Sequence, residues 1–505
     1  MKTYTIDDPE LGQISYRDNK RYLWLVAAIF PLIPFVGMGL VAWSGQQWTI
    51  WIPFVAVYVL VPLLDYVFEN DATNPPEQVV PQLEADPYYR LLIYCAVPLH
   101  VGVLVGGAWF VANYDLGWFG LLGHSLLVGA VSGFSLNLGH ELGHKQPKLD
   151  RMMARLALAV PFYGHFSREH NAGHHAQVAT PEDTASARFG ENIYRFALRE
   201  IPGGLRRAWR LEREHLKRRG YSTWSRHNEI LQSYAISVLL YGGLILAFGA
   251  VILPFLLIQA AWAWWQLTSA NYIEHYGLLR QKGADGRYER CQPHHSWNAN
   301  HVASNLLLFH LERHSDHHAW PARHYQSLRH FEDVPQLPSG YFGMFLLSYI
   351  PPLWRRVMDP RVLEWVDGDL DARDAATAAE RRRRAEAHSW ARRIPQIEAL
   401  LKDEPEETVF WKPVENMPET ISGAERDRLT AAYREAIATK VMPAYRRLLA
   451  YIQDSYLASA RETVGLNALP DGEAWYAFRV KSYTTTDLTA DEIHEIGLAE
   501  VARIQ

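Results

Sequence analysis

The chain has 505 residues, more than a single hydrophobic core usually supports, so at least two structural units are expected. Its formal net charge of -5 is small for this length and gives no reason to expect nucleic acid as a partner. Cys95 and Cys291 are the two cysteines. They exclude a disulfide framework and a four-cysteine iron or zinc site, and with it an electron-transfer domain of that kind.

Six apolar runs are about as long as the roughly 20 helical residues that cross a bilayer. They cover residues 22–44, 49–68, 91–113, 116–138, 231–248 and 251–272. No small-residue cleavage site follows the polar first 21 residues, so the first run predicts a membrane span and not a removable signal. Short and long connections alternate, which indicates three helical hairpins. A buried core of a soluble protein is disfavoured because the runs are apolar on all sides.

Basic residues predict the orientation of these spans. Arg17, Lys20 and Arg21 precede the first run, and many Lys and Arg residues lie between Lys145 and Arg226. Because basic loops stay in the cytosol, both termini and all long connecting segments are expected there. The predicted fold is all-α, an integral membrane protein with six transmembrane helices and a cytosolic cap.

The composition changes near Asp374, where charged and helix-favouring sequence begins. We expect a membrane domain over residues 1–375, a charged linker over 376–389 and a helical segment over 390–505. The four-arginine run in the linker could bind anionic lipid headgroups, although a solvated linker is favoured. His494-Glu495 lacks the second histidine of an HExxH motif, so the last segment is expected to be non-catalytic.

Four short motifs hold most of the informative histidines among the 22 in the chain. They are HELGH at 140–144, EHNAGHH at 169–175, NYIEHYG at 271–277 and HLERHSDHH at 310–318. Histidines four residues apart share one face of a helix, and all four motifs fall on the predicted cytosolic side. A metal centre is therefore expected at that face of the membrane.

The HELGH motif alone also fits a zinc peptidase, in which two histidines bind the metal and the glutamate acts as a base. That reading needs one further ligand, whereas seven other well-placed histidines are present. So many imidazoles exceed the needs of one four-coordinate zinc and favour two metal ions. Imidazole binds iron, copper, nickel and zinc, so the ligand type does not name the metal.

The motifs resemble those of the membrane alkane monooxygenases, distant relatives of membrane fatty-acid desaturases and hydroxylases. The resemblance covers about residues 1–375 and includes NPPE at 74–77, ATPEDTASARFGE from 179 and HSWNANH from 295, with NYIEHYG as the most specific element. It implies two iron ions held by nine histidines without a bridging carboxylate. In this chain these are His140, His144, His170, His174, His175, His275, His314, His317 and His318.

The same resemblance implies a reaction and its partners. We expect O2-dependent hydroxylation of medium-chain n-alkanes to primary alcohols in the bacterial inner membrane, with electrons from rubredoxin and its reductase. A membrane fatty-acyl or xylene hydroxylase or desaturase with the same iron site is the alternative. The alkane is expected to enter from the bilayer through an apolar channel that ends beneath the metals. The basic segment 206–226 is a candidate docking surface for rubredoxin, or simply a solvated face.

Other residues near the motifs receive weaker assignments. His310 is left out of the ligand set, His124 is expected to be a hydrogen-bonded core residue, and His294, His295 and His301 are not assigned ligation. The carboxylates near ligands are expected to orient ring N–H groups and to balance the metal charge, with surface salt bridges as the alternative. They are Glu141, Glu169, Glu274, Asp316 and Asp183. The C-terminal segment is similar to a fragment of a bacterial family of helical, metallopeptidase-like proteins of unknown role.

Overall fold

The computed structural model describes residues 2–8, 12–68, 70–282, 287–366, 394, 397–398, 400–402, 404–418, 421–456, 476–477, 480 and 488–504. Contacts divide the chain into two compact units, which are described separately. Unit 1 is Met1–Arg280 with Tyr288–Ala372, and unit 2 is Gln281–Arg287 with Arg373–Gln505. The predicted linker 376–389, with its four arginines, lies outside the described residues.

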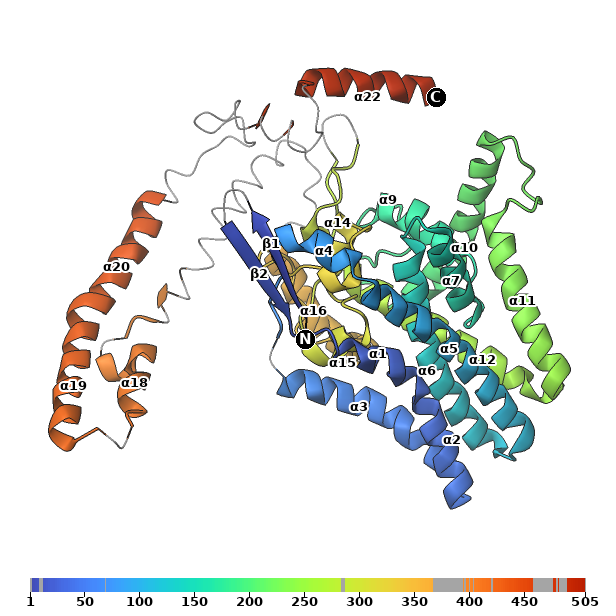
Figure 1. The fold of residues 1–505 in the computed structure, drawn as a ribbon, viewed down its shortest axis with the longest axis horizontal. Coiled ribbons are helices and arrows are strands. Elements are labelled where there is room, and N and C mark those ends of the chain that lie inside the picture. The colour runs from blue at the N-terminus through green and yellow to red at the C-terminus, as the bar shows by residue number, and fades with distance from the viewer. Residues whose placement is uncertain are drawn as a thin grey trace. The chain divides into compact units, whose positions relative to one another are not determined.

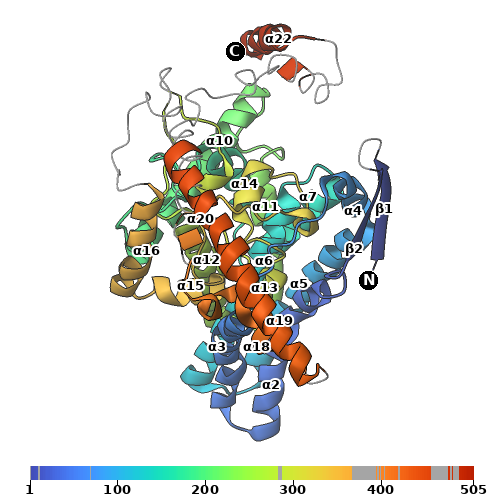
Figure 2. The same ribbon diagram turned by 90° about the vertical axis from the view of Figure 1, so that its left-hand side faces the viewer.

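Six helical segments of unit 1 are long and apolar enough to cross a membrane, as predicted, and the protein is a multi-pass membrane protein. They are Trp24–Ser44 (α1 Trp24–Ile29 and α2 Ile33–Ser44), Gln47–Val67 (including α3 Trp51–Val67), α5 Pro87–Asn113, α6 Gly117–Gly143, α11 Glu229–Phe248 and Ala250–His275 (including α12 Leu253–His275). In Figure 1 these helices lie mostly below the short helices α9 (His175–Gln177) and α14 (His314–Ala319), which carry histidines of the second and fourth motifs, and Figure 2 shows the same fold turned by 90°.

The first 21 residues contain a β-hairpin that the all-α prediction did not include. Strands β1 (Lys2–Asp8) and β2 (Gly12–Asp18) pair antiparallel, with Tyr4 opposite Tyr16 and Ile6 opposite Ile14. The alternation of apolar and polar residues in both strands is the signal for this structure. The remainder of the described fold is helical, so the prediction was right about the class and wrong about this segment.

Helices α6 and α12 form the centre of the bundle because small residues let them approach closely. A Cβ at Gly129 would lie 2.7 Å from the Gln259 carbonyl oxygen, and a Cβ at Gly133 would lie 3.0 Å from the Gln266 Cβ. Small residues four apart commonly line such close contacts between membrane helices. This packing matters for the site because α6 ends in the first histidine motif and α12 ends in the third.

The remaining α-helices of unit 1 lie outside the six candidate spans. They are α4 Val80–Ala85, α7 Lys148–Ala159, α8 Phe166–Glu169, α9 His175–Gln177, α10 Ile193–Arg218, α13 Val302–Leu307, α14 His314–Ala319, α15 Tyr341–Ser348 and α16 Pro351–Trp365. Unit 2 is helical where it is described, with α18 Lys412–Glu415, α19 Gly423–Ala436, α20 Met442–Tyr451 and α22 Ala490–Ile504. Its small apolar cluster contains Trp411, Ile437 and Met442.

Candidate metal centre

The four histidine motifs converge into two groups of imidazoles whose nitrogens lie within 4.8 Å of one another in each group. Group A contains His140, His144, His170, His175 and His317. Group B contains His174, His275, His314 and His318. All nine histidines expected from the sequence are therefore in one of the two groups, and each group draws on at least three of the motifs.

A π-helix explains how one motif serves both groups. Residues His170–His174 form a π-helical turn and not the α-helical turn that the i, i+4 spacing predicted. The wider turn brings His170 and His175 together, with Nε2 atoms 3.0 Å apart, and leaves His174 for group B. Such single π-turns inside helices are frequent at functional sites.

The ring nitrogens are placed as metal ligands would be. In group A, Nε2 of His317 lies 2.8 Å from Nε2 of His140 and 3.2 Å from Nε2 of His175. A metal–imidazole distance of about 2.1 Å puts ligand atoms at right angles about 3.0 Å apart. Among the described residues, Nε2 of His144, His174 and His318 is buried and has no hydrogen-bond partner. The residues thus fit two metal ions, one per group.

Burial favours the neutral form in most of these imidazoles, which is the form that binds metals. It lowers the pKa well below the ordinary value, and neighbouring histidines lower it further. The affected residues outside the spans are His144, His170, His175, His314, His317 and His318. In His174, burial also lowers the pKa, but the Asp183 charge outweighs it and the net shift is upward.

Two of the predicted carboxylates contact ligand rings. Asp183 Oδ2 accepts a hydrogen bond of 2.8 Å from His174 Nδ1, which leaves Nε2 of that ring for a metal. Glu274 Oε2 lies 3.3 Å from His314 Nε2, and Glu274 Oε1 accepts a hydrogen bond of 3.0 Å from the Tyr341 hydroxyl. Both carboxylates thus lie beside ligand rings, and their role in orienting the rings and balancing the metal charge stays a prediction.

The other three carboxylates pair with basic side chains, which corresponds to the salt-bridge alternative. Glu141 pairs with Lys145 at 3.1 Å, and Asp316 pairs with Arg323 at 3.4 Å. Glu169 binds Arg207 through one carboxylate oxygen. In the part of the chain that the structure describes, no hydrogen bond or ion pair joins any of the three to a ring of group A or B. Arg207 comes from a distant segment, whereas Lys145 is four residues after Glu141 and Arg323 is seven residues after Asp316.

Arg207, which sequence reasoning missed, holds two carboxylates at the site. Its guanidinium binds Glu169 and lies 2.7 Å from Asp183, so it fixes the carboxylate that orients His174. Arg207 is 4% exposed although α10 is a charged helix. It lies with Gly204 and Ala208 on the buried face of that helix. The helical periodicity of α10 was the signal that could have placed Arg207 on the buried face.

The His295 loop orients another ligand through its backbone. His275 Nδ1 donates to the His295 carbonyl oxygen at 3.3 Å. The Gln292 N–H donates to His295 Nδ1, so His295 Nε2 carries the ring proton and faces Glu289 Oε1 at 3.2 Å. Glu289, His294 and His295 cluster within ligand distance. The hydrogen bonds above occupy both nitrogens of the His295 ring, and it is the carbonyl group of His295 that supports His275.

The remaining histidines are placed outside both groups. His310 Nδ1 donates to the Tyr325 carbonyl at 3.1 Å, and its ring packs edge-on against Trp24. His124 Nε2 lies 3.2 Å from the Gly107 carbonyl oxygen inside the bundle, as expected for a core histidine. His301 is the residue before α13 and belongs to neither group.

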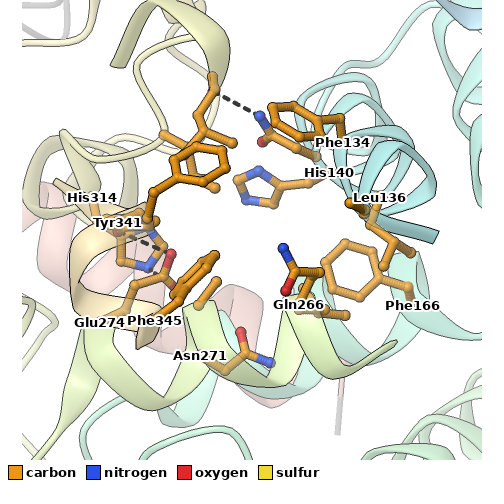
Figure 3. Close-up of a pocket in the computed structure, with 18 of the residues that line it drawn as sticks. Phe134, Leu136, His140, Phe166, Gln266, Asn271, Glu274, His314, Tyr341 and Phe345 are labelled. Carbon is orange, nitrogen blue, oxygen red and sulfur yellow. Dashed lines mark hydrogen bonds and ion pairs between the residues drawn. The ribbon is translucent and has the colours of Figure 1, made fainter. Parts of the chain in front are cut away.

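A largely apolar cavity with an empty volume of about 620 Å³ reaches both histidine groups from the membrane side. Figure 3 shows His140 and His314 on opposite sides of it, with Glu274 and Tyr341 beside His314. The other lining residues are Ala130, Gly133, Phe134, Leu136, Asn137, Phe166, His170, Gln266, Leu267, Ala270, Asn271, Leu308, Leu311, Phe342 and Phe345. The cavity lies between α6, α12 and α15.

Comparison with known proteins identifies the family. Alkane 1-monooxygenase 1 of Alcanivorax borkumensis is 54% identical over 358 residues, which cover 70% of this chain and 88% of that protein. The alkane 1-monooxygenase of Pseudomonas putida is 55% identical over 357 residues, with coverage of 70% and 88%. The chain belongs to the alkane 1-monooxygenase family. It is an oxidoreductase of the monooxygenase class, as the motifs predicted.

Three further matches help to define the extent of this family assignment. The fatty acid desaturase family model matches residues 116–348, which contain all four histidine motifs of this alkane 1-monooxygenase family member. A model of a bacterial protein family of unknown function matches residues 365–505. A xylene/toluene monooxygenase hydroxylase component of Pseudomonas putida is more distant, at 29% identity over 347 residues, with coverage of 66% and 88%.

Proposed function

We propose that this protein hydroxylates the terminal carbon of medium-chain n-alkanes to give primary alcohols, using O2 and two iron ions. The observation that carries the proposal is the apolar cavity, which is open to His140 and His170 of group A and to His314 of group B. The relatives named above as alkane 1-monooxygenases, which match over the same segment, support the choice of substrate.

The chain's own residues hold the metals and exclude water. Groups A and B would bind one iron each, with Asp183 and the His295 carbonyl fixing the rings of His174 and His275. Bound iron supplies the activation of O2, because no side-chain acid, base or nucleophile can oxidise an unactivated C–H bond. The net reaction consumes the alkane, O2, two electrons and two protons and releases the alcohol and water.

Selectivity for the terminal carbon follows from the shape of the cavity. Burying a CH2 group from water contributes about 0.8 kcal/mol of binding free energy. An alkane already dissolves in the bilayer, so this contribution is largely cancelled. Phe134, Phe342 and Phe345 line the same cavity as His140, His170 and His314, so these bulky rings limit how a chain can lie in it. The end of the chain therefore reaches the reacting position first. Entry from the bilayer between the spans fits the position of the cavity between α6 and α12.

The electron donor is proposed to be rubredoxin, reduced by its reductase. Arg206, Arg210, Arg213 and Lys217 are exposed along α10, whose buried face carries Arg207. An acidic donor would be steered to this surface by its charge. The protein would lie in the bacterial inner membrane, with this face, the metal centre and both termini in the cytosol.

The C-terminal segment is proposed to be a non-catalytic addition to the hydroxylase. Its sequence after residue 390 matches a different family model from the membrane domain. Among its described residues, no group of histidine, cysteine or carboxylate side chains lies within metal-ligand distance.

The test is to express the full chain with rubredoxin and its reductase and to supply octane with labelled O2. Labelled octanol and about two iron ions per chain are expected. Desaturated or unlabelled products, or conversion of xylene or a fatty acid in place of octane, would contradict the proposal. One zinc per chain would contradict the two-iron centre.

A further inference from the structure

A buried carboxyl group lies directly behind the cavity wall. Glu200 of α10 is 4% exposed, and its Oε1 accepts a hydrogen bond of 3.1 Å from Asn271 Nδ2. Asn271 lines the cavity, and Figure 3 shows its amide oxygen directed toward the open space. Glu200 Oε2 accepts a hydrogen bond of 2.8 Å from the Thr268 hydroxyl. The carboxyl group thus connects the cap helix α10 to the cavity wall on α12.

No cation neutralises this carboxyl group among the hydrogen bonds and ion pairs of the described residues. The nearby charged groups are Glu169 of α8 and Asp183 of the following loop, and both are held by Arg207. Tyr163 also faces the group. Burying an unpaired carboxylate is costly, so the neutral form becomes accessible. Burial raises the pKa of Glu200 to about 7. The charges of Glu169 and Asp183 also raise this pKa, whereas the hydrogen bonds from Thr268 and Asn271 lower it.

The hydrogen bonds of Glu200 suit either protonation state. An ionised carboxylate accepts from both Thr268 and Asn271, as the structure shows. A protonated carboxyl can donate to the Thr268 oxygen instead, because a hydroxyl group is both donor and acceptor. The proton can therefore be taken up and released without moving α10 or α12.

We infer that Glu200 holds a proton and delivers it to the cavity during hydroxylation. This inference rests on the proposed function, since each turnover consumes two protons along with two electrons from rubredoxin. In each cycle the Glu200 O–H bond breaks, the proton moves into the cavity beside Asn271, and the carboxylate regains a proton from solvent on the cap side. Glu200 is a proton donor to the reaction and holds no metal.

The experiment compares Glu200→Gln, Glu200→Asp and the control Glu214→Gln in the full chain with its electron donor. Glu214 lies on the exposed face of the same helix. Iron content, alcohol formed per electron consumed, the solvent deuterium isotope effect and the pH profile are measured for each. Infrared difference spectra on either side of about pH 7 record the protonated carboxyl group directly.

We expect Glu200→Gln to keep its iron but to hydroxylate about 100-fold more slowly, as for loss of a general acid. The same variant should form fewer alcohol molecules per electron consumed, show a larger solvent isotope effect and lose the infrared carboxyl band. Glu200→Asp should recover part of the rate, and Glu214→Gln should match the wild type. Unchanged coupling, isotope effect and pH profile in Glu200→Gln would overturn the inference, as would equal iron loss in both Glu200 variants. Wild-type protein that makes no alcohol would instead refute the proposed function.

Discussion

His174 Nδ1 donates a hydrogen bond of 2.8 Å to Asp183 Oδ2. This contact fixes which nitrogen of the ring carries the proton, and it leaves Nε2 as the ligand atom. Arg207 binds the same carboxylate, so the orientation of one imidazole depends on a helix that contributes no ligand. The metal centre is therefore coupled to α10, the helix that also carries Glu200.

Asp183→Asn should weaken metal binding without unfolding the protein. The amide keeps the size of the carboxylate but cannot neutralise Arg207 or stabilise the oriented ring of His174. We expect metal affinity to fall about 10-fold to 100-fold, as for other residues that support a ligand. Metal content after dialysis against graded chelator measures the change, with Glu214→Gln as the control. If Asp183→Asn retained as much iron as the wild type, the role of Asp183 in supporting His174 would be refuted.

His174→Ala and His310→Ala should have different consequences, although both remove a buried histidine from a motif. His174 belongs to group B, whereas His310 is hydrogen-bonded to the Tyr325 carbonyl and packs against Trp24. We expect His174→Ala to lose about half of the bound iron and its activity. His310→Ala should keep its iron and lose about 1–3 kcal/mol of stability. Equal iron loss in the two variants would place His310 among the ligands.

Substitutions at the membrane end of the cavity should change the accepted chain length. Ala130 is ten residues before His140 on α6, which is about 15 Å along the helix, and both line the cavity. Ala130→Phe should shorten the longest alkane that is hydroxylated, and Phe134→Ala should lengthen it. Product analysis over a series of n-alkanes measures both shifts. An unchanged preference in both variants would show that the chain takes another path.

Asp86→Asn should destabilise the protein at neutral pH and much less in acid. Asp86 accepts hydrogen bonds from Lys2, Tyr4 and Arg21 and caps α5. Burial raises its pKa, but the bonds from Arg21, Lys2 and Tyr4 outweigh burial and hold the folded-state pKa below the ordinary value. The stabilisation is therefore present above about pH 4 and is lost as the pH falls through the folded-state pKa.

The thermal unfolding midpoint of wild-type and Asp86→Asn protein, measured in detergent at several pH values, tests this prediction. The lost cap alone should cost about 1 kcal/mol above pH 4. The difference between the two proteins should narrow as the pH is lowered. A difference that is the same at all pH values would mean that the ionised carboxylate is not the stabilising group.

Much of the membrane domain could be predicted because the relevant signals are local. Length and hydropathy predicted all six spans within a few residues, except that α6 continues through the HELGH motif to Gly143. The hairpin of β1 and β2 was missed because its alternating pattern lies in a short polar segment where no apolar run draws attention. For Glu141 and Asp316 the salt-bridge alternative describes the contacts, because Lys145 and Arg323 bind them.

The sequence by itself determined that the chain spans a membrane six times and that four histidine motifs fall at one end of the spans. Hydropathy and motif spacing suffice for this because each depends on neighbouring residues in the chain, whereas the set of nine histidines came from the resemblance to alkane monooxygenases. Only the tertiary structure decided how the nine divide into groups of five and four. The π-helical turn at His170–His174 and the contacts of Arg207 and Glu200 depend on how distant helices pack, and no local pattern specifies that packing.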